Sequence, residues 1–167
     1  MTIAESMLPE FDQEMANTRR ALERVPADRM DWGPHSKSMT TGRLATHIAN
    51  LPTWVGLTLG GDRFDMAPPG QDPPRAQPAE SPDAAVETFD RNVAAARAAL
   101  AAADDATMTG AWTLLAGGQT VFTMPRVAVL RSFVMNHVIH HRAQLTVYLR
   151  LCDVPVPALY GPSADES

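Results

Sequence analysis

Residues 125–152 read PRVAVLRSFVMNHVIHHRAQLTVYLRLC, and this stretch predicts a long helix. Pro125 is a favoured first residue of a helix, and Asp153 with the prolines that follow it ends the pattern near Leu151. Apolar residues recur along it in steps of three and four, which place them on one face. That face is predicted to consist of Val127, Leu130, Val134, His137, His141, Leu145, Tyr148 and Cys152.

Three further helices are predicted upstream by the same spacing. The first spans about 4–25 and is stopped by Pro26. The second spans about 41–59, with Thr40 or Thr41 as its N-cap and a kink or early end expected at Pro52. A cap, a proline and an acid at residues 81–83 start the third, which continues through an alanine-rich stretch to residue 103.

The segments between these helices predict one long connection and one hairpin. Five prolines within residues 62–80 indicate an extended crossover on the surface. Residues 107–124 resemble two short strands around Gly117 and Gly118. We therefore predict an all-α fold: an up-down four-helix bundle with a long crossover and a short accessory β-hairpin, in a single domain spanning residues 1–167.

Composition narrows the classes of function. The 167 residues are 45% hydrophobic and 20% charged, which is typical of a globular protein, and their net charge of −5 argues against general nucleic-acid binding. No apolar run is long enough to span a membrane, and the first residues lack the basic start of a signal peptide. Cys152 is the only cysteine, so an internal disulfide is excluded. We expect a cytoplasmic protein without membrane or nucleic-acid partners.

Two histidines occupy positions of the last helix where the pattern calls for aliphatic residues. His137 and His141 are four residues apart, so their rings point the same way. His47 lies on the apolar face of the second helix. A buried imidazole needs compensation, which either a metal ion or hydrogen bonds can provide. Three inward imidazoles predict a metal site that leaves positions open for water or substrate.

Several neighbours of these histidines have more than one interpretation. His140 is three residues after His137 and could replace His141 as a ligand, or lie at the rim of the site. Gln144 could be a partner that orients His141, or a polar residue without a role in the site. Arg142 is expected to be solvated or salt-bridged, or else to anchor an anion. We expect His35 on a surface loop and Cys152 in the core. The acidic candidates for a general base, Asp31 and Glu14, have no predicted contact with the histidines, so no catalytic residue is assigned.

The chain resembles the DinB-like (DinB/YfiT) family. The resemblance rests on HVIHHRAQLTVYLR at 137–150, VPVP at 154–157, Tyr160-Gly161 and MTTGRLATHIANLPTW at 39–54. It implies a four-helix bundle that holds a divalent metal, most often zinc or nickel, through His47, His137 and His141. It also implies a homodimer. Ala143 departs from the glycine usual at that position, and we expect it to favour the helix without loss of metal.

Two classes of function stay open, of which the resemblance implies the first. One is a metal-dependent enzyme, either a hydrolase or a thiol-dependent transferase acting on a small molecule. The alternative is a non-enzymatic, stress-related protein that binds a ligand and whose core histidines are only hydrogen-bonded.

Overall fold

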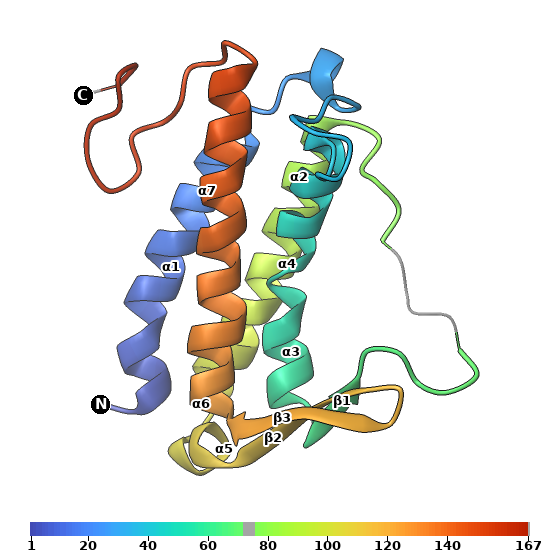
Figure 1. The fold of residues 1–167 in the computed structure, drawn as a ribbon. Helices are drawn as coiled ribbons and strands as arrows, with labels where there is room; N and C mark the ends of the chain where they lie inside the picture. The colour runs from blue at the N-terminus through green and yellow to red at the C-terminus, as the bar shows by residue number, and fades with distance from the viewer. Residues whose placement is uncertain (72–75, 167) are drawn as a thin grey trace.

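The computed structural model describes residues 1–71 and 76–166 and shows a mostly helical chain with a small sheet at one end (Figure 1). The long helical runs are α1 (Ile3–Leu22), α2 (Thr41–Asn50) followed by α3 (Thr53–Leu59), α4 (Pro82–Ala102), and the C-terminal run of α6 (Arg126–Ala128), the π-helical segment η2 (Val129–Met135) and α7 (Asn136–Leu151). Two short helices are η1 (Ala27–Arg29) and α5 (Asp105–Thr109). None of the described helices combines the length and the hydrophobicity that crossing a membrane requires.

Side-chain caps start the helices where the sequence predicts them. The Thr40 hydroxyl accepts a hydrogen bond from the amide of Arg43, and the Ser81 hydroxyl accepts one from the amide of Ala84. The predicted interruption at Pro52 is also confirmed, because α2 ends at Asn50 and α3 begins at Thr53. The first helix ends three residues earlier than predicted, at Leu22.

The helices do not alternate in direction as an up-down bundle would. Thr46 of α2 lines a small cavity with Ala85 of α4, and Leu59 of α3 lines another with Ala102, so α2–α3 and α4 run parallel. The predicted crossover makes this possible, because about twenty residues of extended chain can return along the whole length of α2–α3. Part of that crossover, residues 72–75, lies outside the described residues. The chain is therefore mostly helical, as predicted, but the predicted up-down alternation is wrong.

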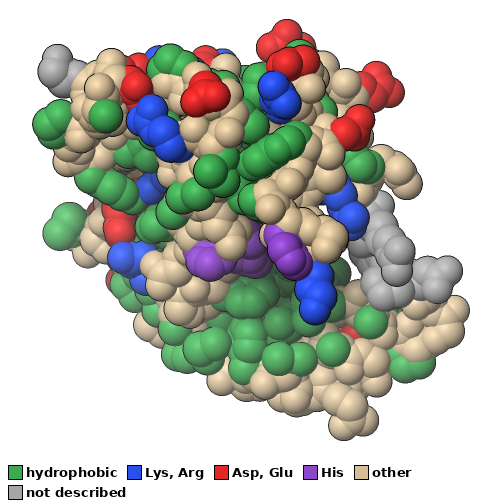
Figure 2. All heavy atoms as spheres, turned by 45° about the horizontal axis from the view of Figure 1, so that its top comes forward, with side chains coloured by type: hydrophobic (Ala, Val, Ile, Leu, Met, Phe, Trp, Pro, Cys, Tyr) green, Lys and Arg blue, Asp and Glu red, His purple; other side chains and the backbone are tan. Residues whose placement is uncertain are grey.

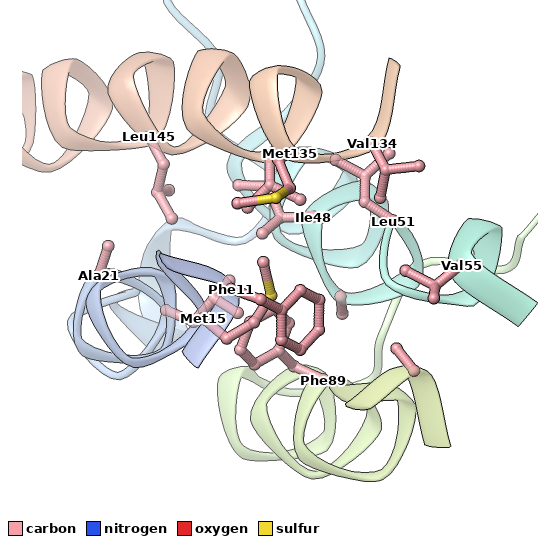
Figure 3. Close-up of a cluster of buried hydrophobic side chains, with 14 of the residues drawn as sticks. Phe11, Met15, Ala21, Ile48, Leu51, Val55, Phe89, Val134, Met135 and Leu145 are labelled. Carbon is pink, nitrogen blue, oxygen red and sulfur yellow. The ribbon is translucent and has the colours of Figure 1, made fainter. Parts of the chain in front are cut away.

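A single apolar cluster fills the space between the helices (Figure 3). Phe11 and Met15 of α1 point toward Phe89 of α4, and Ile48 of α2 and Met135 of the C-terminal run close the cluster from the other side. These side chains are at most 3% exposed, which makes them the main apolar contribution to stability. Helices from distant parts of the sequence are thereby held side by side.

The predicted hairpin is part of a three-stranded sheet. Strands β2 (Ala111–Ala116) and β3 (Gln119–Pro125) pair antiparallel, while β1 (Arg63–Asp65) adds parallel to β2. Gly117 and Gly118 form the turn with φ angles of 61° and 77°, which favour glycine. The Asp65 carboxylate accepts hydrogen bonds from both of their amides, at 3.1 and 2.8 Å. The prediction missed β1, and it placed Thr107–Thr109 in the hairpin where the chain forms α5.

Buried Arg126 attaches this sheet to the helices. Its guanidinium donates hydrogen bonds to the carbonyl of Thr58 at 3.0 Å and of Gly61 at 2.8 Å, and it forms an ion pair with Asp62 at 2.6 Å. These bonds join Arg126, directly after β3, to the end of α3 and to the residues just before β1, so the sheet closes the end of the helical body.

The π-helical segment η2 interrupts the predicted C-terminal helix. The spacing of apolar residues in the sequence does not indicate this interruption. In α7 the buried positions are Val138, Arg142, Leu145, Tyr148 and Leu149. His137 and His141 are half-buried at the edge of that face, and Cys152 is half-buried at the end of the helix. The predicted face is thus rotated slightly from the observed one, because the wider turns of a π-helix change the angle between successive side chains.

Arg142 occupies the core-facing position beside the histidines and is 1% exposed. Its guanidinium pairs with the Glu14 carboxylate of α1 at 2.7 Å and donates to the Glu14 carbonyl at 3.0 Å. The hydroxyl of Tyr160 donates to the same carboxylate at 2.7 Å and also contacts the guanidinium. The salt-bridged interpretation of Arg142 is confirmed, and the pair joins α1, α7 and the C-terminal segment.

Removing one partner of this buried pair leaves the other charge uncompensated. We expect Glu14→Ala to lower the free energy of unfolding by about 3–5 kcal/mol, measured by urea denaturation. Glu10→Ala is the matched control, because the Glu10–Arg131 pair joins the same two helical runs but is nearly half exposed, and its loss is expected to cost less than about 1 kcal/mol. Equal effects of the two substitutions would contradict a stabilising role specific to the buried pair.

Candidate metal site

The structure brings His47, His137 and His141 together between α2 and α7. One nitrogen from each ring can be chosen so that all three lie within 4.8 Å of one another, and the Nε2 atoms of His47 and His137 are 3.3 Å apart. Ring centroids are 4.4 Å apart for His47 and His141 and 4.7 Å for His137 and His141. All three side chains are half-buried.

Local helix geometry explains this convergence. His137 and His141 are one turn apart on α7, so their rings stack along the same side of the helix. Helices α2 and α7 run antiparallel, since the Tyr148 hydroxyl donates to the Met39 carbonyl at 3.2 Å while His47 meets His137 farther along. The ring of His47 therefore lies against both rings of the α7 pair.

The donor set fits a divalent transition metal. Imidazole nitrogens bind zinc at about 2.0–2.1 Å, and two such ligands in tetrahedral geometry are separated by about 3.3 Å. The separation of His47 Nε2 and His137 Nε2 has this value. Three nitrogen ligands suit zinc, nickel, copper or iron better than magnesium or calcium, which prefer oxygen.

Two neighbouring side chains contact the histidine group. The Nδ1 of His141 donates to Gln144 Oε1 at 2.7 Å, which fixes the ring's orientation and leaves Nε2 to face the other histidines. The ring of His140 is 4.8 Å from that of His141 and is exposed. His140 thus lies at the rim, and it is not one of the three converging residues.

Burial keeps the three imidazoles neutral. It lowers the pKa of His47 to about 4, because the charged form loses hydration and the two neighbouring rings disfavour a further positive charge. Burial also lowers the pKa of His137, assisted by His141 and His140, and that of His141, where the bond to Gln144 opposes the effect. Neutral imidazole is the form that binds metal, so the site is ready to accept an ion at neutral pH.

Other residues singled out in the sequence lie away from the site. Glu14 is engaged by Arg142, and Asp31 is exposed. His35 is exposed, as expected, and its Nδ1 accepts a hydrogen bond from the amide of Lys37.

An apolar cavity of about 470 Å³ adjoins His47. Its walls include Trp54 and Leu57 of α3, Phe64 of β1 and Met66, and the Trp54 ring packs edge-on against Phe133 at 5.1 Å. Figure 2 shows the histidines at the surface beside a continuous hydrophobic area. The sequence analysis missed these residues. In the sequence, only the aromatic residues of two short segments point to this cavity. Their relation to each other follows from the structure, in which β1 lies beside α3.

The lowered pKa of His47 makes the stability of the metal-free protein depend on pH. The His47 side chain takes up a proton near pH 6.5 in the unfolded chain and only near pH 4 in the folded chain. Its contribution to the free energy of unfolding is therefore complete above pH 6.5 and is lost as the pH falls toward 4. With solvent screening we expect a loss of about 1–2 kcal/mol from this group in urea denaturation of EDTA-treated protein. His47→Gln should flatten the profile, and His35→Gln should leave it unchanged; a profile unaffected by His47→Gln would contradict the assignment.

Comparisons with known proteins identify the family and the fold of the chain. A family model described as "DinB family" matches residues 1–167. A crystal structure of a DinB-like protein from Bacillus cereus has a TM-score of 0.71 and 23% identity, covering 95% of this chain and 98% of that one. A DinB-like protein from Bacillus subtilis has a TM-score of 0.67 and 17% identity, covering 94% and 99%. No curated protein sequence matches significantly. The two structures share the fold, and the family match over the whole length shows that the chain belongs to the DinB family.

Proposed function

We propose that this protein binds one divalent metal ion, zinc or nickel, through His47, His137 and His141. The observation that carries the proposal is the convergence of three neutral imidazoles from two helices, with two of their nitrogens already at the separation of ligands on one ion. Imidazole suits several transition metals, and zinc and nickel are proposed among them because the resemblance to the DinB-like family implies these two.

The proposal extends to a metal-dependent enzyme acting on a small molecule. Three protein ligands leave coordination positions free, as in catalytic sites, and a cavity large enough for a small ligand adjoins His47. A bound ion would supply Lewis acidity, lowering the pKa of a water molecule or a low-molecular-weight thiol. Three neutral ligands leave the positive charge of such an ion uncompensated, which strengthens this effect.

The chain's own residues have separate tasks in this proposal. Gln144 orients His141 through its Nδ1, and the rings of Trp54 and Phe133 exclude water from one side of the site. The exposed imidazole of His140 lies next to His141, at the rim of the site. Hydrolysis and thiol transfer need the same ion but different co-reactants. Assays with esters and amides, without and with added thiols, therefore separate the two reactions.

A second candidate function is a non-enzymatic binding protein. The observation that favours it is the His47–His137 contact at 3.3 Å, which one shared proton can make into a hydrogen bond without any metal. In that case the purified protein would contain no stoichiometric metal, and added zinc would leave its melting temperature unchanged.

Substitution of the proposed ligands tests the metal site directly. We expect about one ion per chain in the wild type by elemental analysis, and less than about a tenth of that in His47→Ala and in His137→Ala, because two imidazoles hold the ion far more weakly than three. His140→Ala is the matched control and should keep its metal, since this exposed histidine does not converge with the others. Metal that persists without His47, or that is lost without His140, would contradict the proposed ligand set.

Gln144 provides a finer test of the same site. We expect Gln144→Ala to weaken zinc affinity by about 10–100-fold, because His141 loses the acceptor that fixes its ring. Gln144→Glu keeps an acceptor oxygen and should retain or increase the affinity. Competition with a chromogenic chelator gives the dissociation constants. Equal affinities for the wild type and Gln144→Ala would show that Gln144 plays no part.

A further inference from the structure

Two cavities meet at His47. The first is the apolar cavity of about 470 Å³ already described, and the second has about 210 Å³ and includes Met39, Arg43 and Pro78 in its walls. The side chain of His47 and Ala76 line both. The two spaces therefore adjoin at His47 and Ala76, and together they are called the cleft, with each space as one of its arms.

The two arms differ in chemistry. Trp54, Leu57, Phe64 and Met66 give the larger arm an apolar lining, to which Asn50 and Thr53 add polar groups. Arg43 provides the cation of the smaller arm, and it lies one helical turn before His47 on the same side of α2.

Arg43 is exposed and has no counter-ion among the described carboxylates. In a chain with a net charge of −5, a free guanidinium on a cavity wall is a local attraction for an anion. Its planar fork suits the two oxygens of a carboxylate.

We infer that the cleft binds a small organic anion that carries an apolar group of about ring size, with the anionic end on Arg43 and the apolar end between Trp54, Leu57 and Phe64. The part of the ligand that joins the two ends then lies against His47, where the proposed ion would be held. This inference rests on the proposed function and names its substrate class: amphipathic carboxylates, whether the reacting molecule or a thiol co-substrate.

Calorimetric titration of EDTA-treated protein tests the cleft apart from the metal, with 4-phenylbutanoate, its neutral amide and butanoate as probes. We expect 4-phenylbutanoate to bind about tenfold or more tightly than butanoate, because only it fills the apolar arm. We expect it to bind about 5–10-fold more tightly than the amide, because only it is charged. Leu57→Ser should weaken the binding of 4-phenylbutanoate and the binding of the amide by similar factors.

Arg43→Gln should remove the preference for 4-phenylbutanoate over the amide. Arg63→Gln is the matched control, because it removes the same charge from the strand that carries Phe64, and Arg63 lines a different cavity. It should leave the preference intact. Both arginines are exposed, and equal melting temperatures of the two variants confirm that they are folded.

Three results would overturn the inference: no preference for the ring, no preference for the anion, or an anion preference that Arg43→Gln leaves unchanged. A preference for the anion that appears only after zinc is added would also overturn it, because the ion would then recognise the carboxylate in place of Arg43. If the wild type binds no metal and yet the metal-free cleft selects 4-phenylbutanoate through Arg43, the proposed metal site fails while the binding cleft stands.

Discussion

His47 and His137 approach each other with their Nε2 atoms 3.3 Å apart, and both rings are held neutral by burial. Two neutral imidazoles repel each other when both lone pairs face the same point, so the contact requires either one shared proton or a cation. His141 brings a third ring to the same place, for which a single proton offers no further bond. A cation would satisfy all three rings at once, and the proposed function rests on this.

The fold fixes the two helices that carry these rings on either side of the site. Arg142, directly after His141, is tied to Glu14 of α1. Farther along α7, the Tyr148 hydroxyl is bonded to the Met39 carbonyl just before α2 begins. The position of α7 is therefore held by contacts outside the histidine group, one to α1 and one to the chain just before α2. Such a site needs little rearrangement to accept an ion, which keeps the cost of binding low.

Interactions between residues close together in the sequence were sufficient to predict much of this structure. Thr40, Ser81 and Pro52 act through neighbours within four residues, so the helix limits they define were predictable. The placement of each histidine on the apolar face of its helix followed from spacing, but the meeting of His47 with the α7 pair joins residues 90 apart and was implied by the family resemblance. The strand β1 was not predictable, because three residues have no periodicity and their pairing with β2 depends on a contact about fifty residues away. The direction of α4 depends likewise on where the crossover ends. Arg142 was expected to be solvated or salt-bridged, or else to anchor an anion, and its burial was not predictable because it depends on Glu14, 128 residues away in sequence.

A crystal structure with anomalous diffraction data collected on both sides of the metal absorption edge tests the central claim most directly. The account predicts one strong anomalous peak about 2.0–2.2 Å from a nitrogen of each of His47, His137 and His141, with Gln144 still bonded to His141 Nδ1. Crystals grown in the presence of zinc or nickel that show no peak between these rings, or a peak held by other residues, would contradict it.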